Sequence, residues 1–408
     1  VRQSAEAMAA RGMRVLGVAK AHFEGSEWPG QQHDFDFEFL GLVGLADPLR
    51  PSVQAAIREC RTAGIKVAMI TGDYPATALA IAAQAGIDTS GGVLKGDELQ
   101  TLSDEQLRER LATTRVFARI MPEQKLRIVN AYKANGDVVA MTGDGVNDAP
   151  SLKAAHIGIA MGGRGTDVAR EASGIILMDD DFASIVRAVR LGRRIYDNLR
   201  KAITFVLAVH IPIAGLSLVP LLFGWPLIFY PVHIAFLELV IDPVCSIVFE
   251  AEPAERSVMQ RPPRAADSPL LSFKLLLWSV FQGGTVLLAV GGFFILLLNR
   301  GLPQDQARAA SFVALVVANF GLIIVNRAFD ASLISALARP NRALWRMLAA
   351  TIALLAAALW IPVLRTIFNF GAISGDLLAG AIGLGFGVLL ALELVKKMGA
   401  GKALAPST

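Results

Sequence analysis

The sequence MTGDGVND occupies residues 141–148, directly after the apolar run Val138–Ala140. The run is typical of a buried strand, and the carboxylates Asp144 and Asp148 flank a glycine that permits a tight turn. Carboxylate oxygens suit Mg²⁺, which is a hard cation. An Ω-loop or a calcium site would use similar residues, but the spacing of an EF-hand is absent. The stretch therefore predicts a magnesium-binding loop at the end of a strand.

Short β-branched runs alternate with helical stretches between residues 37 and 200. The expected strand and helix pairs are 37–44 with 50–63, 65–70 with 76–85, 116–118 with 122–134, and 138–141 with 149–155. Alternation at this spacing predicts an α/β doubly wound parallel sheet with helices on both faces. Ligands of such sheets bind beyond the carboxyl ends of the strands.

Six apolar stretches follow Lys201, and they lie at 202–223, 231–249, 275–298, 309–326, 347–364 and 377–395. Each is close to the ~20 residues that a bilayer-spanning helix needs. The chain is 54% hydrophobic with a mean hydropathy of +0.50, which is high for a soluble enzyme. Core helices of a large globular domain explain such long uncharged runs poorly. We therefore predict an all-α bundle of six transmembrane helices in a lipid bilayer.

Basic residues gather in every second loop of this apolar part, as Arg193, Arg264 and Arg339 illustrate. The positive-inside rule places these loops, the α/β domain and both termini in the cytoplasm, and the plasma membrane is the expected location. Because orientation explains the formal charge of +4, nucleic acid is not an expected partner. Cys60 and Cys245 are too few for a disulfide framework.

Two further segments that end expected strands carry residues able to bind phosphate. In the first, Thr71, Gly72 and Asp73 offer a hydroxyl and a backbone N–H group to phosphoryl oxygens. In the second, Lys125 lies one turn into a helix that begins at Pro122, where it could neutralise a transferring phosphoryl group. Taken alone, the triplet fits a plain loop and the lysine fits a solvated surface, so each assignment depends on its neighbours.

Together these segments resemble the phosphorylation domain of P-type cation-transporting ATPases, in the calcium and sodium-potassium pump group of the haloacid-dehalogenase superfamily. The matching motifs are DPLR at 47–50, TGD at 71–73, FAR at 117–119 with Pro122 and Lys125, TGDGVNDAPSLKAA at 142–155, GIAM at 158–161 and TDVA at 166–169. The longest motif is highly specific. The resemblance continues through a stalk helix at 179–201 and covers nearly the whole chain.

The resemblance implies that the γ-phosphoryl group of ATP passes to an aspartate and is then hydrolysed, while an ion is occluded between membrane helices. Asp144 would hold Mg²⁺, with Asp148 as a second carboxylate of the metal site. The implied catalytic residues are Thr71 and Gly72, which bind the phosphoryl group, Lys125, which stabilises it, Asp73, and Asn147, which orders the site. The implied nucleotide-associated residues are Asp47, Arg50 and Arg119.

The chain also departs from the family pattern, because neither the nucleophile motif DKTGT nor the actuator motif TGE occurs in it. We therefore expect the C-terminal part of a pump, inactive without an N-terminal part that carries the phosphorylated aspartate. The expected domains are 1–36, the tail of a nucleotide-binding domain; 37–185, the phosphorylation domain; 186–201, the stalk; 202–395, the six membrane helices; and 396–408, a cytoplasmic tail.

The second apolar stretch carries Glu238 and Asp242 four residues apart, on one face of a helix. Carboxylates inside a membrane are costly and mark an ion path, and Pro243 could leave a carbonyl free to act as a ligand. Related pumps have an Asn where Glu238 stands and a Glu where Ile213 stands, and His210 lies one turn before Ile213. A packing role explains His210 as well as a ligand role does. The two acids favour one site for Ca²⁺ or another divalent cation.

Two other interpretations stay open at this stage. One is a membrane-tethered phosphatase of the same superfamily, for which Asp36 is the candidate nucleophile although no KTGT sequence follows it. The other is a non-catalytic subunit that completes a split pump.

Overall fold

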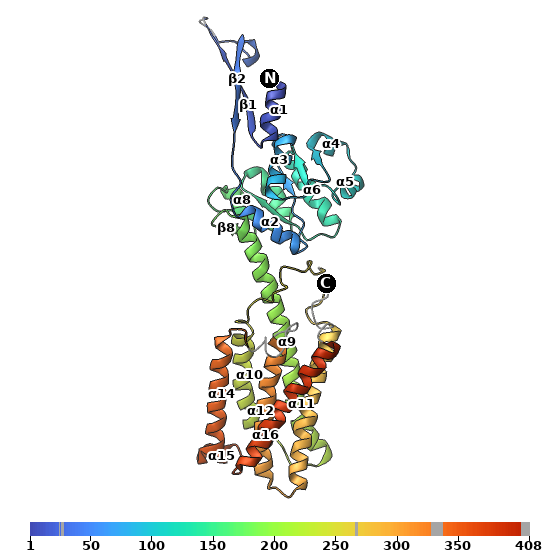
Figure 1. Ribbon diagram of the computed structural model, residues 1–408, viewed down its shortest axis with the longest axis vertical. Helices are drawn as coiled ribbons and strands as arrows, with labels where there is room; N and C mark the ends of the chain where they lie inside the picture. The colour runs from blue at the N-terminus through green and yellow to red at the C-terminus, as the bar shows by residue number, and fades with distance from the viewer. Residues whose placement is uncertain (24, 26–27, 266–267, 328–337, 401–408) are drawn as a thin grey trace. The chain divides into compact units, whose positions relative to one another are not determined.

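The computed structural model describes residues 1–408 except 24, 26–27, 266–267, 328–337 and 401–408, and it leaves the side chains at 242, 245, 399 and 400 undescribed. The chain divides into two compact units (Figure 1). One consists of Val1–Val189 with Met259–Ala266, and the other of Arg190–Val258 with Asp267–Thr408. The first is called the α/β unit below, and the second the helical unit.

The α/β unit begins with helix α1 (Arg2–Ala10) and an antiparallel pair of strands, β1 (Arg14–Ala21) and β2 (Phe37–Leu45). A short 3-10 helix, η1 (Gln32–Asp34), lies between the two strands. The prediction that 37–44 starts the parallel sheet is therefore wrong, because this strand pairs antiparallel with the preceding strand β1. An apolar pattern identifies a strand, but it does not identify the partner of that strand.

The remaining strands of the α/β unit pair in parallel, as predicted, and they form two three-stranded sheets. One has the order β3 (Met69–Ile70), β5 (Val116–Ala118), β4 (Val93–Lys95), and the other has the order β6 (Ala140–Gly143), β7 (Ile157–Met161), β8 (Ile175–Leu177). Only the last two residues of the strand expected at 65–70 join a ladder. The N–H group of Ile65 bonds the carbonyl of Cys60 at 2.8 Å, since Gly64 with φ +69° turns the chain out of the preceding helix.

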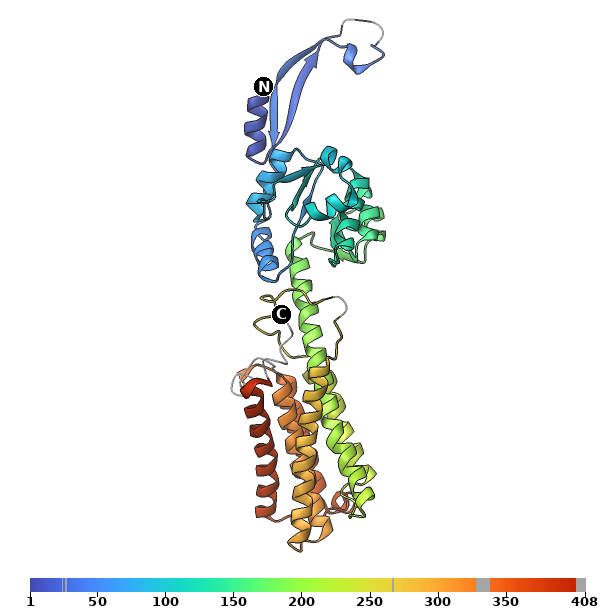
Figure 2. The same ribbon diagram turned by 90° about the vertical axis from the view of Figure 1, so that its right-hand side faces the viewer.

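Helices pack on both sides of these strands. They are α2 (Val53–Thr62), α3 (Pro75–Ala85), α4 (Gly96–Thr101), α5 (Asp104–Arg110), α6 (Pro122–Ala134), α7 (Ala149–Ala154) and α8 (Asp167–Glu171), and a 3-10 turn, η2 (Val146–Asp148), precedes α7. In Figure 2 the blue helices α2 and α3 lie on one side of the strands and the green helices lie on the other. Phe117 of β5 and Ile128 of α6 are fully buried in one core cluster, which fixes α6 against the strands.

The helical unit contains six helices that are long and apolar enough to cross a membrane, counted over the described residues, as the sequence predicted. They are α9 (Phe182–Phe223), α10 (Pro231–Pro243) with the π-helix η3 (Val244–Val248), α11 (Phe273–Asn299), α12 (Gln304–Arg327), α14 (Arg342–Trp360) and α16 (Gly375–Val395). The short helix α15 (Pro362–Ile367) follows α14, and the π-helix η4 (Lys396–Ala400) follows α16. Helix α9 starts in the α/β unit and is continuous through the expected stalk.

The fifth apolar stretch ends earlier than predicted, at Trp360 rather than at 364. Ile361 has an extended backbone with φ −80° and ψ 119°, because a residue before proline avoids the helical region. Pro362 then begins α15, where its missing N–H group costs nothing.

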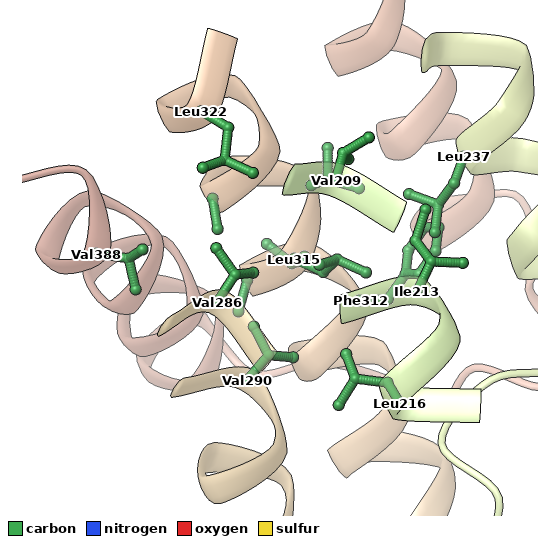
Figure 3. Packing of buried hydrophobic residues seen from close by; sticks show 14 of the residues in the cluster. Val209, Ile213, Leu216, Leu237, Val286, Val290, Phe312, Leu315, Leu322 and Val388 are labelled. Carbon is green, nitrogen blue, oxygen red and sulfur yellow. The ribbon is translucent and has the colours of Figure 1, made fainter. Parts of the chain in front are cut away.

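Helix α12 lies at the centre of the helical unit. In its most apolar window 83% of the residues are buried, against 22% to 39% in the other five helices. Figure 3 shows Phe312 and Leu315 of α12 among Val209 of α9 and Val286 of α11. The outward faces of the surrounding helices remain apolar and exposed, which suits contact with lipid tails.

Candidate functional site

The TGD segment forms a tight loop where β3 ends. The N–H group of Thr71 donates to the Phe117 carbonyl at 2.9 Å, and the Thr71 carbonyl accepts from the N–H group of Ile120 at 3.1 Å. The Thr71 hydroxyl donates to Oδ2 of Asp73 at 3.0 Å and accepts from the Asp73 N–H group at 3.1 Å. Gly72 lies exposed at the tip, and no atom lies within 4 Å of the position a Cβ there would take. The loop is thus held at both ends and open in the middle.

Lys125 and Asp148 meet although 23 residues separate them in the sequence. Nζ of Lys125 donates to Oδ1 of Asp148 at 2.6 Å, and the N–H group of Gly145 donates to Oδ2 at 3.3 Å. The side chain of Lys125 is 19% exposed and that of Asp148 is 9% exposed. Both carboxylate oxygens of Asp148 are therefore engaged: Oδ1 holds the ammonium group of Lys125, and Oδ2 binds the backbone of the TGDGVND loop.

The same loop presents its other polar residues outward. Asp144 and Asn147 are exposed, and the Asp144 carbonyl accepts from the N–H group of Thr166 at 2.8 Å, which ties the loop to the start of α8. Gly143 cannot carry a side chain, because a Cβ there would lie 2.5 Å from Cβ of Asp148. The outward position of Asp144 leaves its carboxylate able to meet a cation, whereas Asp148 faces the protein.

Arg119 follows β5 in a left-handed conformation with φ 51°. Its N–H group donates to the Asp73 carbonyl at 3.1 Å, and its guanidinium group lies 5.4 Å from the centre of the Tyr74 ring. Strained positions of this kind often occur at functional sites. The left-handed turn therefore joins the FAR and TGD motifs.

A cavity of about 880 Å³ opens beside these residues within the α/β unit. Gly72, Asp73 and Arg119 line one part of it, and Arg2 and Arg14 contribute from α1 and β1. The sequence analysis did not select Arg2 or Arg14. The sequence shows Arg14 at the start of an apolar strand, but only the fold shows that it lies beside the cavity. Glu6, Asp73 and Asp97 also line the cavity, and Arg2 pairs with Glu6 at 3.3 Å, so Arg14 and Arg119 are the two arginines best suited to a ligand that carries phosphate.

Arg50 lies in a different setting from the one the sequence suggested. Its guanidinium group donates to the carbonyl of Asp180, and to that of Asp179 at 3.4 Å. Asp47 is exposed in the loop that precedes α2. Arg50 therefore holds the turn before α9, and nucleotide roles for Asp47 and Arg50 stay predictions.

Asp180 completes that turn. It has φ 51°, and its carboxylate accepts from the N–H groups of Gly163 and Arg164 at 3.0 Å each. Burial opposes the charged form of Asp180, but the backbone N–H groups outweigh it and lower the pKa below the usual value. The negative charge of Asp180 is thus part of the folded structure of this turn.

In the helical unit, His210 of α9 faces Glu238 of α10. Nε2 of His210 lies 3.6 Å from Oε1 of Glu238, and Nδ1 lies 2.7 Å from the carbonyl of Val206. The two side chains are 47% and 39% exposed. Ile213 is buried in the apolar core and offers no ligand atom. The side chain of Asp242 lies outside the described residues, and α10 gives way to the π-helix η3 directly after Pro243.

A second group of charged residues, which the sequence analysis missed, is buried in the helical unit. Nε of Arg327 donates to Oε2 of Glu252 at 2.9 Å, and Nδ2 of Asn341 donates to the same oxygen at 2.9 Å. Nζ of Lys201 donates to Oε1 of Glu255 at 2.6 Å. We call these five residues the Glu252 network. Four of its members are charged, and the partners of its two ion pairs lie 75 and 54 residues apart in the chain, so local sequence gives no sign of their pairing.

Residues 4–156 match the family model for haloacid dehalogenase-like hydrolases, and residues 226–398 match the model for the C-terminus of cation transporting ATPases. The chain belongs to the cation-transporting ATPases. The first match contains Thr71, Lys125 and Asp144, and the second contains Glu238. The resemblance recognised in the sequence is confirmed.

Several curated relatives agree with this membership. The chain is 39% identical over 374 residues to a calcium-transporting ATPase of Bacillus subtilis (strain 168), which covers 90% of this chain and 42% of the relative. It is 35% identical over 397 residues to calcium-transporting ATPase 1 of Lactococcus lactis, covering 96% and 45%, and 41% identical over 282 residues to calcium-transporting ATPase 1 of Saccharomyces cerevisiae, covering 68% and 30%. The chain thus spans less than half the length of these relatives.

Proposed function

We propose that this ATPase chain is the phosphorylation domain and C-terminal membrane part of a pump that uses ATP to move a divalent cation across a membrane. The observation that carries the proposal is the Lys125–Asp148 ion pair at 2.6 Å. It joins two motifs at the carboxyl edge of parallel strands, where α/β proteins bind their ligands.

In this proposal Thr71 and Gly72 bind the transferring phosphoryl group, and Lys125 neutralises the charge that develops on it. The open tip at Gly72 offers a backbone N–H group, and Asp148 keeps the Lys125 ammonium in place. Preorganised donors of this type stabilise a transition state without rearranging. Asp73 supports the Thr71 hydroxyl through their mutual hydrogen bonds.

The residues present also fit Mg²⁺. Asp144 offers an exposed carboxylate after a strand, and oxygen is the donor that this cation prefers. When bound, Mg²⁺ would supply positive charge to the phosphoryl oxygens. Asp148 would act mainly by positioning Lys125, since both of its oxygens already accept hydrogen bonds, and the exposed Asn147 would help to order the loop.

ATP is the proposed phosphoryl donor, and its nucleotide would bind in the cavity beside Arg119. Arg50 holds the turn at 179–180, which is not part of the lining of this cavity, so its proposed nucleotide role rests on the resemblance alone. Asp47 is the remaining candidate of this group.

The transported cation would bind at Glu238 and Asp242, with His210 as a third candidate. The relatives named as calcium-transporting ATPases support a divalent ion. A location in the plasma membrane, with the α/β unit in the cytoplasm, is part of the proposal, as is a partner segment that carries the phosphorylated aspartate.

The test is phosphoenzyme formation from radiolabelled ATP in a complete pump that contains this chain. Lys125→Met should lower turnover about 10²- to 10³-fold, because it removes a donor aimed at the developing charge. Lys133→Met, on the same helix, is the matched control. Nζ of Lys133 donates to the Ala154 carbonyl, so this variant should keep most of the activity. Equal activity in the two variants would contradict the proposed site.

A second arm concerns the partner segment. The isolated chain should form no phosphoenzyme, and mixing with a separately produced N-terminal part should restore it. Phosphatase activity of the isolated chain that is lost in Asp36→Asn would instead support the phosphatase alternative. Asp36 directly precedes β2, whose nine residues extend roughly 30 Å before the chain turns toward α2, and this placement gives that alternative little support.

A further inference from the structure

We propose that His210 and Glu238 form a site for a divalent transition cation that binds imidazole nitrogen, a class that runs from Mn²⁺ to Zn²⁺. The inference rests on the proposed function, since it names the class of cation that the pump would carry. Its support comes from which atom of His210 is available, how far that atom lies from Glu238, and what the neighbouring residues lack.

The hydrogen bond to Val206 decides which nitrogen of His210 is available. A backbone carbonyl can only accept, so Nδ1, at 2.7 Å from the Val206 oxygen, carries a hydrogen. Nε2 then presents its lone pair in the neutral ring. Histidines that bind metals nearly always donate their other N–H group to a carbonyl or a carboxylate in this way. The ring of His210 is thus held in the orientation that a metal ligand requires.

Nε2 of His210 points to a second ligand atom. It lies 3.6 Å from Oε1 of Glu238, on the neighbouring helix α10. Two ligand atoms on one tetrahedral ion, each with a bond of about 2.1 Å, are separated by roughly 3.4 Å. One ion can therefore reach both atoms with small side-chain adjustments. Both side chains are more than a third exposed, which leaves room for further ligands.

The types of donor atom then select the cation. Ca²⁺ takes six to eight oxygen ligands, whereas imidazole suits first-row transition ions. Beside His210, Ile213 is buried in the apolar core and supplies no oxygen. Even with the Asp242 carboxylate of the proposed function, whose side chain lies outside the described residues, an imidazole nitrogen and two carboxylates fall short of the six to eight oxygens that Ca²⁺ takes, and they suit an ion that accepts a mixed donor set.

The test uses Co²⁺ as the probe on the purified chain in detergent. Nitrogen ligation of Co²⁺ at this site should produce visible absorption bands that saturate with added metal. His210→Asn should weaken Co²⁺ binding at least tenfold, since removing even a group that supports a ligand costs about 10- to 100-fold. His33→Asn is the matched control, because His33 is exposed in the hairpin of the α/β unit and should not affect the bands.

A second variant distinguishes loss of a metal ligand from loss of binding through misfolding. Glu238→Gln keeps the size of the side chain and should also weaken Co²⁺ binding, while its elution profile and helical circular dichroism match the wild type. Unchanged Co²⁺ binding in His210→Asn would overturn the proposal. So would complete displacement of Co²⁺ by an equal concentration of Ca²⁺.

The cation dependence of the complete pump distinguishes this inference from the proposed function. Stimulation of ATP hydrolysis by Co²⁺ or Zn²⁺, reduced in His210→Asn, supports both. Stimulation by Ca²⁺ without any response to Co²⁺, Mn²⁺ or Zn²⁺ keeps the pump and overturns the inference. An ATPase that responds to no cation contradicts the proposed function itself.

Discussion

Asp144 and Arg119 are exposed around the loops of the α/β unit, whereas Glu252 and Arg327 of the helical unit are fully buried and bonded to each other. Arg119 lines an open cavity and Asp144 is exposed on its loop, whereas Glu252 and Arg327 fill a closed interior. Burying a charge is costly unless a partner and hydrogen bonds compensate for it. The difference indicates that the α/β unit keeps charge available for a ligand, while the Glu252 network uses its charges to hold helices together.

His210 and Glu238 belong with the first kind of arrangement although they lie in the helical unit. Their side chains stay partly exposed at 3.6 Å, while Lys201 and Glu255 are buried and bonded at 2.6 Å. Exposure of a charged group between apolar helices is expensive, so it favours a functional explanation.

The largest effect is expected from removing a charge from the buried Glu252 network. Glu252→Ala would leave the buried guanidinium group of Arg327 without its carboxylate, so the free energy of unfolding should fall by about 3–5 kcal/mol. Thermal unfolding of the chain in detergent measures this. Glu250→Ala is the control, because the Glu250 side chain is exposed, and it should leave the unfolding temperature nearly unchanged.

The double variant Glu252→Met with Arg327→Leu sharpens the same point. Replacing a buried pair by apolar side chains is often neutral, so the double variant should unfold at a higher temperature than Glu252→Ala. A double variant as unstable as the single one would show that the hydrogen bonds of Asn341 and the surrounding packing, rather than the charge pair, govern stability here.

A smaller effect is expected from Asp148→Asn in the α/β unit. The change removes the charge that faces Lys125 and weakens the bond to Gly145, so the loss of stability should be about 1–3 kcal/mol. Lys125 is partly exposed, and water can solvate its ammonium group in part. Denaturant unfolding of the variant and of Asp167→Asn, whose side chain is 89% exposed, provides the comparison. A loss as large as that of Glu252→Ala would remove the contrast between the two units.

The smallest expected effect depends on pH and involves Asp180. Its pKa is lower in the folded chain than in the unfolded one, so its contribution to stability is present above pH ~4 and disappears as the pH falls through the folded pKa. The difference in unfolding temperature between wild type and Asp180→Asn should therefore be constant near pH 7 and shrink below pH ~4. Asp36→Asn, at an exposed position, serves as the control. A difference that grows on acidification would have the wrong sign.

Sequence motifs predicted the turns of the α/β unit because each motif is local, while the roles of the site residues stay predictions. The TGD and TGDGVND segments each encode a turn at the carboxyl end of a strand, β3 in one sheet and β6 in the other. The expectation that Lys125 and Asp148 belong to one site matches the bond between them at 2.6 Å. The number of membrane helices was equally accessible, because length and hydropathy suffice to find them.

Features that depend on long-range pairing were not predictable in this way. The predicted pairing of β2 was wrong because the apolar pattern of residues 37–44 indicates a strand but not which strand pairs with it or in which direction. Glu252 and Arg327 lie 75 residues apart, and the local sequence around each gives no indication that the two side chains pair. The end of α14 differs, because Pro362 marks it in the local sequence even though the apolar pattern continues past it.

Gly143 shows how little variation this loop tolerates. A single added carbon there would lie 2.5 Å from Asp148, the residue that holds Lys125. In genetic terms, third-base changes in the Gly143 codon are silent, whereas a change in either of the first two bases introduces a side chain or stops translation. We therefore expect missense alleles at this codon to behave as loss-of-function alleles, even when the new residue is as small as alanine.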